Sequence, residues 1–260
     1  MYIFLILTHF IRRRGECCLL QKSCAENVII LFTLLKFSMS EKLTVMVNGL
    51  PGSMGLEVAA ACLRRGYNVA SVALTGKTKG TCEISAETTE DNKQTVQLIP
   101  SNTETTESEL RTYIESIRGP LIVVDYTHPS AVNANGELYA KLKIPFVMGT
   151  TGGDRTKLYS DTEQAGTYAV IAANMCKQIV ALQTVLENMS VQFPGAFEGY
   201  KLNVTESHQS HKADTSGTAK EMVKYFNGLT SSSYQISDIV KHRDTISQKG
   251  KCMKVESINN

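Results

Sequence analysis

Continuous apolar runs, rich in β-branched residues, recur between residues 43 and 174. They read LTVMVNG (43–49), NVASVAL (68–74), PLIVVDY (120–126), IPFVMG (144–149) and YAVIAAN (168–174). Runs of this kind are typical of parallel strands that are buried on both faces. Apolar residues at helical spacing lie between them, over 54–62, 110–117 and 131–142. Strands that alternate with helices predict a doubly wound parallel sheet, a Rossmann-like α/β domain, which we assign to residues 41–171.

The pattern changes after residue 171. A long helix is predicted over 177–189, then an alternating strand YKLNVTES, then a helix with apolar residues at 219, 222, 223 and 226. This order lacks the strand–helix–strand rhythm, so it predicts a second, smaller α+β domain over 172–260. Two polar stretches give less: 76–106 contains one strand candidate, QTVQLIP, and the tail from Ser231 predicts no clear element.

The first forty residues contain two short apolar runs around Arg12–Arg14. Neither run is long enough for a membrane span, and the basic cluster follows the first run, whereas a signal peptide places it before. Glu16 and Glu26 argue against a plastid or mitochondrial presequence, which is poor in acids. We expect 1–40 to be an extension outside the fold and the protein to be cytoplasmic. The alternative is a plastid protein with residues 1–38 as its presequence.

Composition narrows the class of partner. The chain has 42% apolar and 20% charged residues and a formal net charge of +2, and its lysines and arginines are spread along the sequence. This balance gives no reason to expect a nucleic-acid or membrane partner, so a small molecule is expected. The seven cysteines include no C-x-x-C pair, and we therefore expect no disulfide framework and no metal site.

A glycine-rich turn follows the first predicted strand. In GLPGSMG the residues Gly49, Gly52 and Gly55 stand between a strand and a helix. The first permits a tight turn, the second lets the backbone approach a pyrophosphate, and the third lets the helix pack closely on the strand. The sequence therefore predicts a dinucleotide site.

The end of the second strand bears on which dinucleotide is bound. An acidic residue for the ribose hydroxyls is expected there, but the stretch ALTGKTKG offers Thr75, Lys77 and Lys79 and no carboxylate. Without an anion to repel a 2′-phosphate, NADPH is permitted as well as NADH.

The stretch TESHQSHKADTSGTAK, residues 205–220, carries the second candidate site. His208, His211 and Lys212 lie between a strand end and a helix start. The helix entrance offers Ser216 as one N-cap candidate and Thr218 with Glu221 as a capping box. Free backbone N–H groups at that entrance would form a carboxylate receptor. Imidazole and ammonium groups beside such a receptor suggest proton transfer to an acidic small molecule during a reduction.

Taken together, the motifs resemble the family of 4-hydroxy-tetrahydrodipicolinate reductases, also called dihydrodipicolinate reductases, and its plant-type branch in particular. The resemblance runs in order from about Leu43 to Leu229. It is carried by VNGLPGSMG, VVDYTHP, VMGTTGG, AANMCKQ, FPGAFEGYKL and ESHQSHKADTSGTAK. It implies an oxidoreductase of lysine biosynthesis by the diaminopimelate pathway that uses NADPH or NADH. The implied reaction is hydride transfer to C4 of 4-hydroxy-tetrahydrodipicolinate, with a proton added and water lost.

The resemblance also implies roles for individual residues. His208 matches the catalytic histidine, and Lys212 matches the lysine that donates a proton and contacts the substrate. Ser216, Gly217 and Thr218 match the turn that grips a substrate carboxylate, and Gln209, where many bacterial members have histidine, is an uncharged substrate contact. The implied cofactor-binding residues are Gly49, Gly52, Ser53, Met54, Gly55, Thr75, Lys77, Thr127, Gly149, Thr150 and Thr151.

The end of the chain departs from the family. Family members continue with further strands that build a tetramer, and the closing residues SQKGKCMKVESINN match none of them. We therefore expect a substrate-binding and oligomerisation domain that is C-terminally incomplete, and a homo-oligomer only by resemblance. Two alternatives remain open: a non-catalytic nucleotide-binding remnant of the family, and a homoserine- or aspartate-type dehydrogenase. The second shares the G-x-x-G-x-x-G start but is disfavoured by the HQxxK and TSGTA segments.

Overall fold

The computed structural model describes residues 42–76, 79–86, 93–101, 103–172, 174–208, 215–243 and 254–258. The chain divides into two compact units, Met1–Ala173 and Asn174–Asn260. The predicted domain boundary, between 171 and 172, lies close to this division. The predicted extension 1–40 lies outside the described residues, and the roles assigned to the two domains stay predictions at this point.

The first unit is built on a five-stranded parallel sheet of order β2-β1-β6-β7-β8. Its strands are β1 (Thr44–Asn48), β2 (Asn68–Val69), β6 (Leu121–Asp125), β7 (Phe146–Met148) and β8 (Ala169–Ile171). All four pairings are parallel. Every residue of β1 and β7 is buried, as the continuous apolar runs predict for strands covered on both faces.

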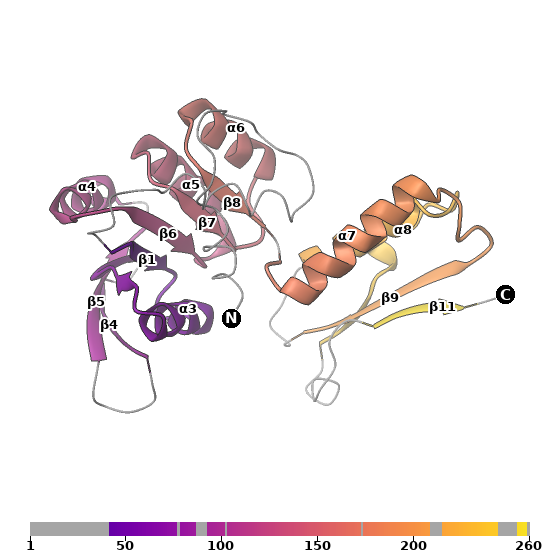
Figure 1. The fold of residues 1–260 in the computed structure, drawn as a ribbon, viewed down its shortest axis with the longest axis horizontal. Helices are drawn as coiled ribbons and strands as arrows, with labels where there is room; N and C mark the ends of the chain where they lie inside the picture. Colours follow the sequence, from indigo (N-terminus) through magenta and orange to yellow (C-terminus); the bar gives the residue numbers. More distant parts are fainter. Residues whose placement is uncertain are drawn as a thin grey trace. The chain divides into compact units, whose positions relative to one another are not determined.

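Helices cover both faces of this sheet (Figure 1). They are α3 (Ser53–Arg64), α4 (Thr106–Ser116), α5 (Val132–Lys141) and α6 (Arg155–Ala165), with a short 3₁₀ turn, η1 (Pro129–Ala131), before α5. One core cluster joins Leu110 of α4, Tyr139 of α5 and Leu158 of α6 to the strands. Those three helices therefore pack on one face, and α3, with Val58 and Cys62 buried, packs on the other. The predicted doubly wound α/β fold is confirmed.

A second sheet of three strands, in the order β3-β5-β4, continues from the main one. Its strands are β3 (Val72–Thr75), β4 (Gly80–Ser85) and β5 (Lys93–Pro100). The run NVASVAL, expected to be one strand, is thus divided between β2, which pairs with β1, and β3, which pairs with β5. The two sheets are joined by a backbone hydrogen bond: the N–H of Gly49, directly after β1, donates to the carbonyl of Leu74 in β3 at 2.9 Å.

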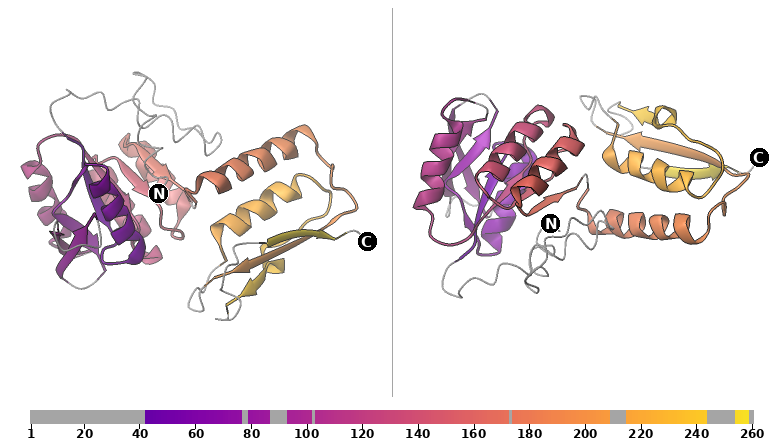
Figure 2. Two further views of the ribbon diagram at one scale, coloured as in Figure 1. Left: turned by 60° about the horizontal axis from the view of Figure 1, so that its bottom comes forward. Right: turned by 90° about the horizontal axis from the view of Figure 1, so that it is seen from above.

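The second unit combines a small mixed sheet with two helices. Its elements are α7 (Lys177–Gln192), β9 (Lys201–Ser207), α8 (Gly217–Asn227), the 3₁₀ turn η2 (Ile236–Asp238), β10 (Val240–His242) and β11 (Lys254–Ile258). The sheet order is β10-β9-β11, with β10 parallel and β11 antiparallel to β9. Figure 2 shows α7 and α8 on the same side of this sheet. The core of the unit gathers Val204, Ala219, Val223 and Ile239, which confirms the smaller α+β domain.

Helix α6 and strands β4, β10 and β11 were not predicted, and β4 lies in the polar stretch 76–106. Helix α6 has only Leu158 and Thr162 buried, too thin an apolar stripe to be recognised, although the Asp154 side chain caps its first turn by accepting from the N–H of Lys157 at 3.0 Å. Strands β10 and β11 lie in the tail that predicted no element. All three residues of β10 are exposed, so its sequence carries no alternation.

The capping box predicted at Thr218 and Glu221 is wrong. Helix α8 begins two residues earlier than that box requires, with Ser216 as N-cap and, within the described residues, no side-chain cap hydrogen bond. The Thr218 hydroxyl is instead occupied as the acceptor of a 2.8 Å hydrogen bond from Nδ2 of Asn174. Ser216, the other candidate, is therefore the residue at the helix entrance.

Among the described residues, none of the helices combines the length and the apolar character that crossing a membrane requires.

Candidate functional site

The strands of the first unit end together at one edge of the sheet. β1 ends at Asn48, directly before Gly49, while β6 ends at Asp125 and β7 at Met148. Since the carboxyl ends of parallel strands share an edge, the loops that carry Gly49, Thr127 and Thr150 emerge side by side. This is the place where ligands of such sheets bind.

The glycine-rich loop passes so close to its neighbours that side chains would not fit. A Cβ on Gly49, whose φ is +98°, would lie 2.4 Å from the carbonyl oxygen of Tyr126, and one on Gly52 would lie 2.7 Å from the Gly49 oxygen. Gly55 packs the first turn of α3 onto the same loop, with a Cβ position 3.2 Å from the Gly49 carbonyl. The three glycines are therefore required by close backbone approach as well as by the motif.

The N-terminus of α3 faces this loop, and the first turn of the helix carries no acid. The N-cap residue, Gly52, has no side chain. Ser53 and Met54, the first two helical residues, are exposed. A helix start of this kind offers N–H groups and a partial positive charge to a phosphate, so these residues fit the pyrophosphate of a dinucleotide.

Thr75, at the end of β3, lies beside the same loop. Its hydroxyl donates to the carbonyl of Leu50 at 2.7 Å, which ties the β3 end to the glycine turn and commits the hydroxyl proton. Lys77, the other residue predicted at this end, lies outside the described residues.

A buried carboxylate, Asp125, organises the ends of β6 and β7. Its side chain is 0% exposed. Oδ1 accepts from the backbone N–H of Thr127 at 2.8 Å, from the Thr127 hydroxyl at 2.6 Å and from the Thr150 hydroxyl at 3.3 Å. Oδ2 accepts from the hydroxyl of Tyr139 at 2.5 Å and from Nδ2 of Asn135 at 3.0 Å.

The same network reaches the glycine loop. Nδ2 of Asn48, the residue before Gly49, donates to the Tyr139 hydroxyl at 2.7 Å, and its Oδ1 accepts from the N–H of Leu74 at 2.7 Å. Burial, followed by the nearby Asp125 charge, raises the pKa of Tyr139, so the phenol stays protonated as a donor. Buried side chains thus fix three strand ends relative to one another.

The β7 loop, GTTGG, is shaped by its neighbours. The ring of Tyr126 lies where a Gly149 side chain would stand, since a Cβ there would be 2.4 Å from the ring. The Thr150 carbonyl accepts from Nη2 of Arg155 at 2.8 Å. Because N–H and C=O of a trans peptide point in opposite directions, the N–H of Thr151 points away from Arg155. Burial lowers the pKa of this arginine. Its Nη1 is buried, and no described residue offers it a hydrogen-bond partner.

The second candidate site lies in the other unit and centres on another buried carboxylate. The side chain of Glu206, on β9, is 2% exposed. Oε2 accepts from the backbone N–H of Ser216 at 2.8 Å and lies 3.7 Å from Nε2 of His208. Oε1 is paired with Nη2 of Arg243 at 2.5 Å. His208 itself is held by its backbone N–H, which donates to the His242 carbonyl at 3.1 Å.

The helix entrance is therefore only partly the free N–H receptor expected from the sequence, because Glu206 occupies the Ser216 amide. Gly217 and Thr218 follow in the first turn of α8. Gln209, His211 and Lys212 lie outside the described residues, so the structure brings together His208, Ser216, Gly217 and Thr218 but says nothing of the other three.

Asp125, Glu206 and Arg243 were not singled out from the sequence. A signal existed for the two acids, since each stands in or at the end of a strand, within the motifs VVDYTHP and ESHQSHK. A charged residue inside a buried strand is costly unless partnered, so it points to a polar network. Arg243, far along the chain from Glu206, carried no such signal.

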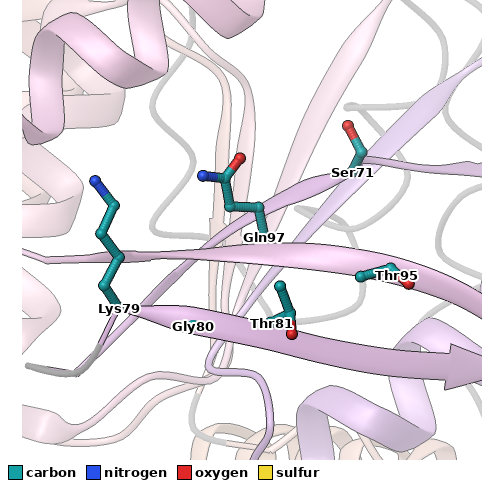
Figure 3. Close-up of a pocket in the computed structure, with 6 residues that line it drawn as sticks. All are labelled: Ser71, Lys79, Gly80, Thr81, Thr95 and Gln97. Carbon is teal, nitrogen blue, oxygen red and sulfur yellow. The ribbon is translucent and has the colours of Figure 1, made fainter.

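A pocket also lies elsewhere in the first unit. It measures about 530 Å³ over the β3-β5-β4 sheet and is lined by Ser71, Lys79, Gly80, Thr81, Thr95 and Gln97 (Figure 3). Lys79 is paired with Glu109 at 3.4 Å. Lys79, from the stretch ALTGKTKG, lines this pocket, but the other predicted site residues do not. The exposed polar side chains of the pocket are those of a solvated sheet face. Within the described residues, no group of three or more His, Cys, Asp or Glu is placed to hold a metal ion.

Three comparisons with known proteins bear on this arrangement. The chain is 46% identical over 202 residues to 4-hydroxy-tetrahydrodipicolinate reductase 2, chloroplastic, of Arabidopsis thaliana, covering 78% of this chain and 55% of that protein. It is 42% identical over 200 residues to the probable 4-hydroxy-tetrahydrodipicolinate reductase 2, chloroplastic, of Oryza sativa subsp. japonica, covering 77% and 59%. The chain thus spans a little over half the length of these relatives.

A solved structure shares the fold. Dipicolinate-bound dihydrodipicolinate reductase from Paenisporosarcina sp. TG-14 matches with a TM-score of 0.50 at 17% identity, covering 84% of this chain and 88% of that one.

The family comparison covers the first unit. Residues 43–175, about half of the chain, match the model "Dihydrodipicolinate reductase, N-terminus", and they include the glycine loop, Asp125 and the GTTGG loop. The chain belongs to the dihydrodipicolinate reductase family.

Proposed function

We propose that the protein reduces 4-hydroxy-tetrahydrodipicolinate to tetrahydrodipicolinate with NADPH or NADH, in lysine biosynthesis by the diaminopimelate pathway. Substrate, reduced cofactor and one proton give product, oxidised cofactor and water. The proposal rests on family membership, on plant relatives named for this reaction, and on the chemistry of the two candidate sites.

The first unit would hold the cofactor. Gly49, Gly52 and Gly55 leave room for a pyrophosphate against the start of α3, where Ser53 and Met54 follow. Thr75 and Lys77 would lie toward the adenosine ribose, and with no carboxylate in ALTGKTKG a 2′-phosphate meets no repulsion. Thr127, Gly149, Thr150 and Thr151 would surround the nicotinamide. The cofactor, when bound, supplies the hydride.

The second unit would hold the substrate. A dicarboxylate requires cationic groups and N–H donors, and His208, Lys212 and the start of α8 are of those types. Ser216, Gly217 and Thr218 would hold one carboxylate, with Gln209 as an uncharged contact. Lys212, assisted by His208, would deliver the proton to the ring.

One observation carries the proposal: the carboxylate of Glu206 lies 3.7 Å from His208 and accepts from the N–H of Ser216 at 2.8 Å. A buried acid would thereby fix the spacing between the group that moves a proton and the turn that holds the anion. A polar loop without function has no need of such a costly connection.

The test is oxidation of NADPH, followed by absorbance, with purified protein and the synthase that forms the substrate. Steady turnover that depends on both substrate and protein is the expected result. A folded sample that binds NADPH and shows no oxidation contradicts the reductase function and favours a nucleotide-binding remnant. Comparing kcat/KM for NADPH and NADH then decides the cofactor preference.

The remaining properties are proposals from the relatives. Both plant relatives are named chloroplastic, so we favour the plastid over the cytoplasm, which a fluorescent fusion of the full chain would test. The partner is a small dicarboxylate, and a homo-oligomer is expected from the family resemblance, to be measured by sedimentation.

A further inference from the structure

The side chain of Thr127 has its hydrogen-bonding direction set by its surroundings. Its hydroxyl proton is committed to Oδ1 of Asp125, 2.6 Å away. Its oxygen accepts from Nδ2 of Asn135 at 3.1 Å. A threonine oxygen has two lone pairs, so the described residues leave it one acceptor position and no donor. The residue is half-buried, at the strand ends where the cofactor is proposed to bind.

Asp125 is what prevents this hydroxyl from turning. A carboxylate only accepts hydrogen bonds, and bonds to it are stronger than bonds to neutral acceptors. The backbone N–H of Thr127 is held on the same oxygen at 2.8 Å, so both donors of one residue converge on one atom. Rotating the Thr127 hydroxyl outward would leave part of a fully buried carboxylate without its donor, which is costly.

The other donors around Asp125 cannot take over that position. The Tyr139 hydroxyl and Nδ2 of Asn135 are directed to Oδ2. The Thr150 hydroxyl lies 3.3 Å from Oδ1 but only 3.1 Å from the carbonyl of Thr127, so it divides its single proton among acceptors. Thr150 is also buried, 6% exposed, and its hydroxyl points into this network. Any contact of Thr150 with a ligand must therefore come from its backbone.

We propose that Asp125 is a positioning residue that holds Thr127 Oγ1 as a pure acceptor, and that this oxygen selects the N–H of the cofactor's nicotinamide carboxamide. This assignment rests on the proposed use of a nicotinamide cofactor. It specifies the direction of this hydrogen bond: Thr127 Oγ1 accepts and the carboxamide N–H of the ligand donates. An unrestrained threonine would bind a donor or an acceptor equally well.

A ligand that lacks the donor tests the direction in the unmodified protein. The 3-acetylpyridine analogue of NADPH replaces the amide NH₂ by a methyl group and keeps the carbonyl. We expect its Kd, measured by fluorescence titration, to exceed that of NADPH by about tenfold, the cost of one buried acceptor left unpaired. Equal affinity for the two ligands would overturn the assignment.

Variants distinguish the role of Thr127, which contacts the ligand, from that of Asp125, which positions Thr127. Thr127→Val should remove the discrimination between NADPH and the analogue, while Thr127→Ser, which keeps the hydroxyl, should retain it. As a single substitution, Asp125→Asn should reduce the difference in Kd between NADPH and the analogue. In a protein that already carries Thr127→Val it should cause no further change in that difference, because Asp125 acts through Thr127. The binding of 2′-phospho-ADP-ribose, which lacks nicotinamide, should change less than threefold in the Thr127 variants.

The outcomes are distinguishable from those of the reductase test. Binding with discrimination but without turnover contradicts the reductase function and leaves Asp125 and Thr127 as assigned. Turnover without discrimination, or with discrimination that survives Thr127→Val, overturns the assignment and leaves the reductase function intact. If Asp125→Asn does not fold, the analogue in the unmodified protein and the two Thr127 variants still decide.

Discussion

The carboxylate of Glu206 and the backbone N–H of Ser216 are joined by a 2.8 Å hydrogen bond between β9 and the first turn of α8. The bond places a negative charge, 2% exposed, at the positive end of a helix, which is favourable. Arg243 supplies the opposite charge at 2.5 Å. One acid thus connects strand β9, which His208 directly follows, with the helix entrance and the segment after β10.

The first prediction concerns this acid. Glu206→Ala would leave the buried part of Arg243 and the Ser216 N–H without their partner, so the free energy of unfolding should fall by about 3–5 kcal/mol. Urea unfolding of the full chain measures it. Glu198→Gln is the control, because Glu198 also accepts from a backbone N–H, that of Ser231, but is exposed. A loss no larger than that of the control would show that Glu206 is not a structural centre.

A second prediction concerns the glycine loop. Gly49→Ala and Gly52→Ala would force a Cβ to 2.4 Å and 2.7 Å from backbone oxygens, so the loop must move, at a strain of about 1–3 kcal/mol. We expect weaker NADPH binding, by tenfold or more, in titrations. Gly80→Ala is the matched control, since a Cβ there would have no described atom within 4 Å. Unchanged affinity in Gly49→Ala would rule out this loop as the phosphate site.

A third prediction concerns the proposed proton donor. If Lys212 delivers the proton, Lys212→Ala should lower kcat by about 10²- to 10⁴-fold while NADPH affinity stays within threefold. Lys220→Ala, an exposed lysine on α8, should leave kcat unchanged. A decrease in kcat of less than threefold in Lys212→Ala would assign the proton to another group.

The parallel sheet could be predicted because its signal is local. β1 and β7 are buried at every position, and such strands read as unbroken apolar runs. The break between β2 and β3 could not be predicted, because it depends on which neighbour each half pairs with. Helix α6 was missed because it has no clear apolar face. Only two of its residues are buried, so it depends more on its caps and its neighbours.

The candidate site likewise has a part that could be predicted from local sequence and a part that could not. The glycine loop and the His208 segment are short motifs in the sequence, and both were found. The networks that hold them are not local: Tyr139 reaches Asp125 across 14 positions, and Arg243 reaches Glu206 across 37. Only the arrangement of the strand ends shows that these residues meet. The direction of the Thr150 hydroxyl, into the network, is likewise a property of the fold.

A fourth prediction concerns Arg155. Its Nη2 donates to the Thr150 carbonyl, but its Nη1 is buried with no partner in the part of the chain that the structure describes. The favourable hydrogen bond is therefore offset by an unfavourable burial. Arg155→Met should therefore change the free energy of unfolding by less than about 1 kcal/mol. It should nevertheless weaken NADPH binding, because the Thr150–Thr151 peptide loses its fixed orientation. Loss of stability without loss of affinity would make Arg155 a purely structural residue.

The last prediction is a pH dependence that arises from Cys62. Burial raises the pKa of this thiol from 9.0 to about 12, with Arg65 opposing the shift. Below pH 9 the thiol is protonated in both the folded and the unfolded chain, so its contribution to stability is fully present. Between pH 9 and 12 the unfolded chain releases the proton and the folded chain keeps it. The free energy of unfolding should therefore fall with pH, by at most about 1.4 kcal/mol per pH unit from this group.

Cys62→Ala should remove that part of the slope, whereas Cys176→Ala, at an exposed thiol, should not. Urea unfolding at pH 8, 9.5 and 10.5 measures all three proteins, and equal slopes for Cys62→Ala and the unmodified chain would mean that the Cys62 thiol ionises as readily in the folded state as in the unfolded one.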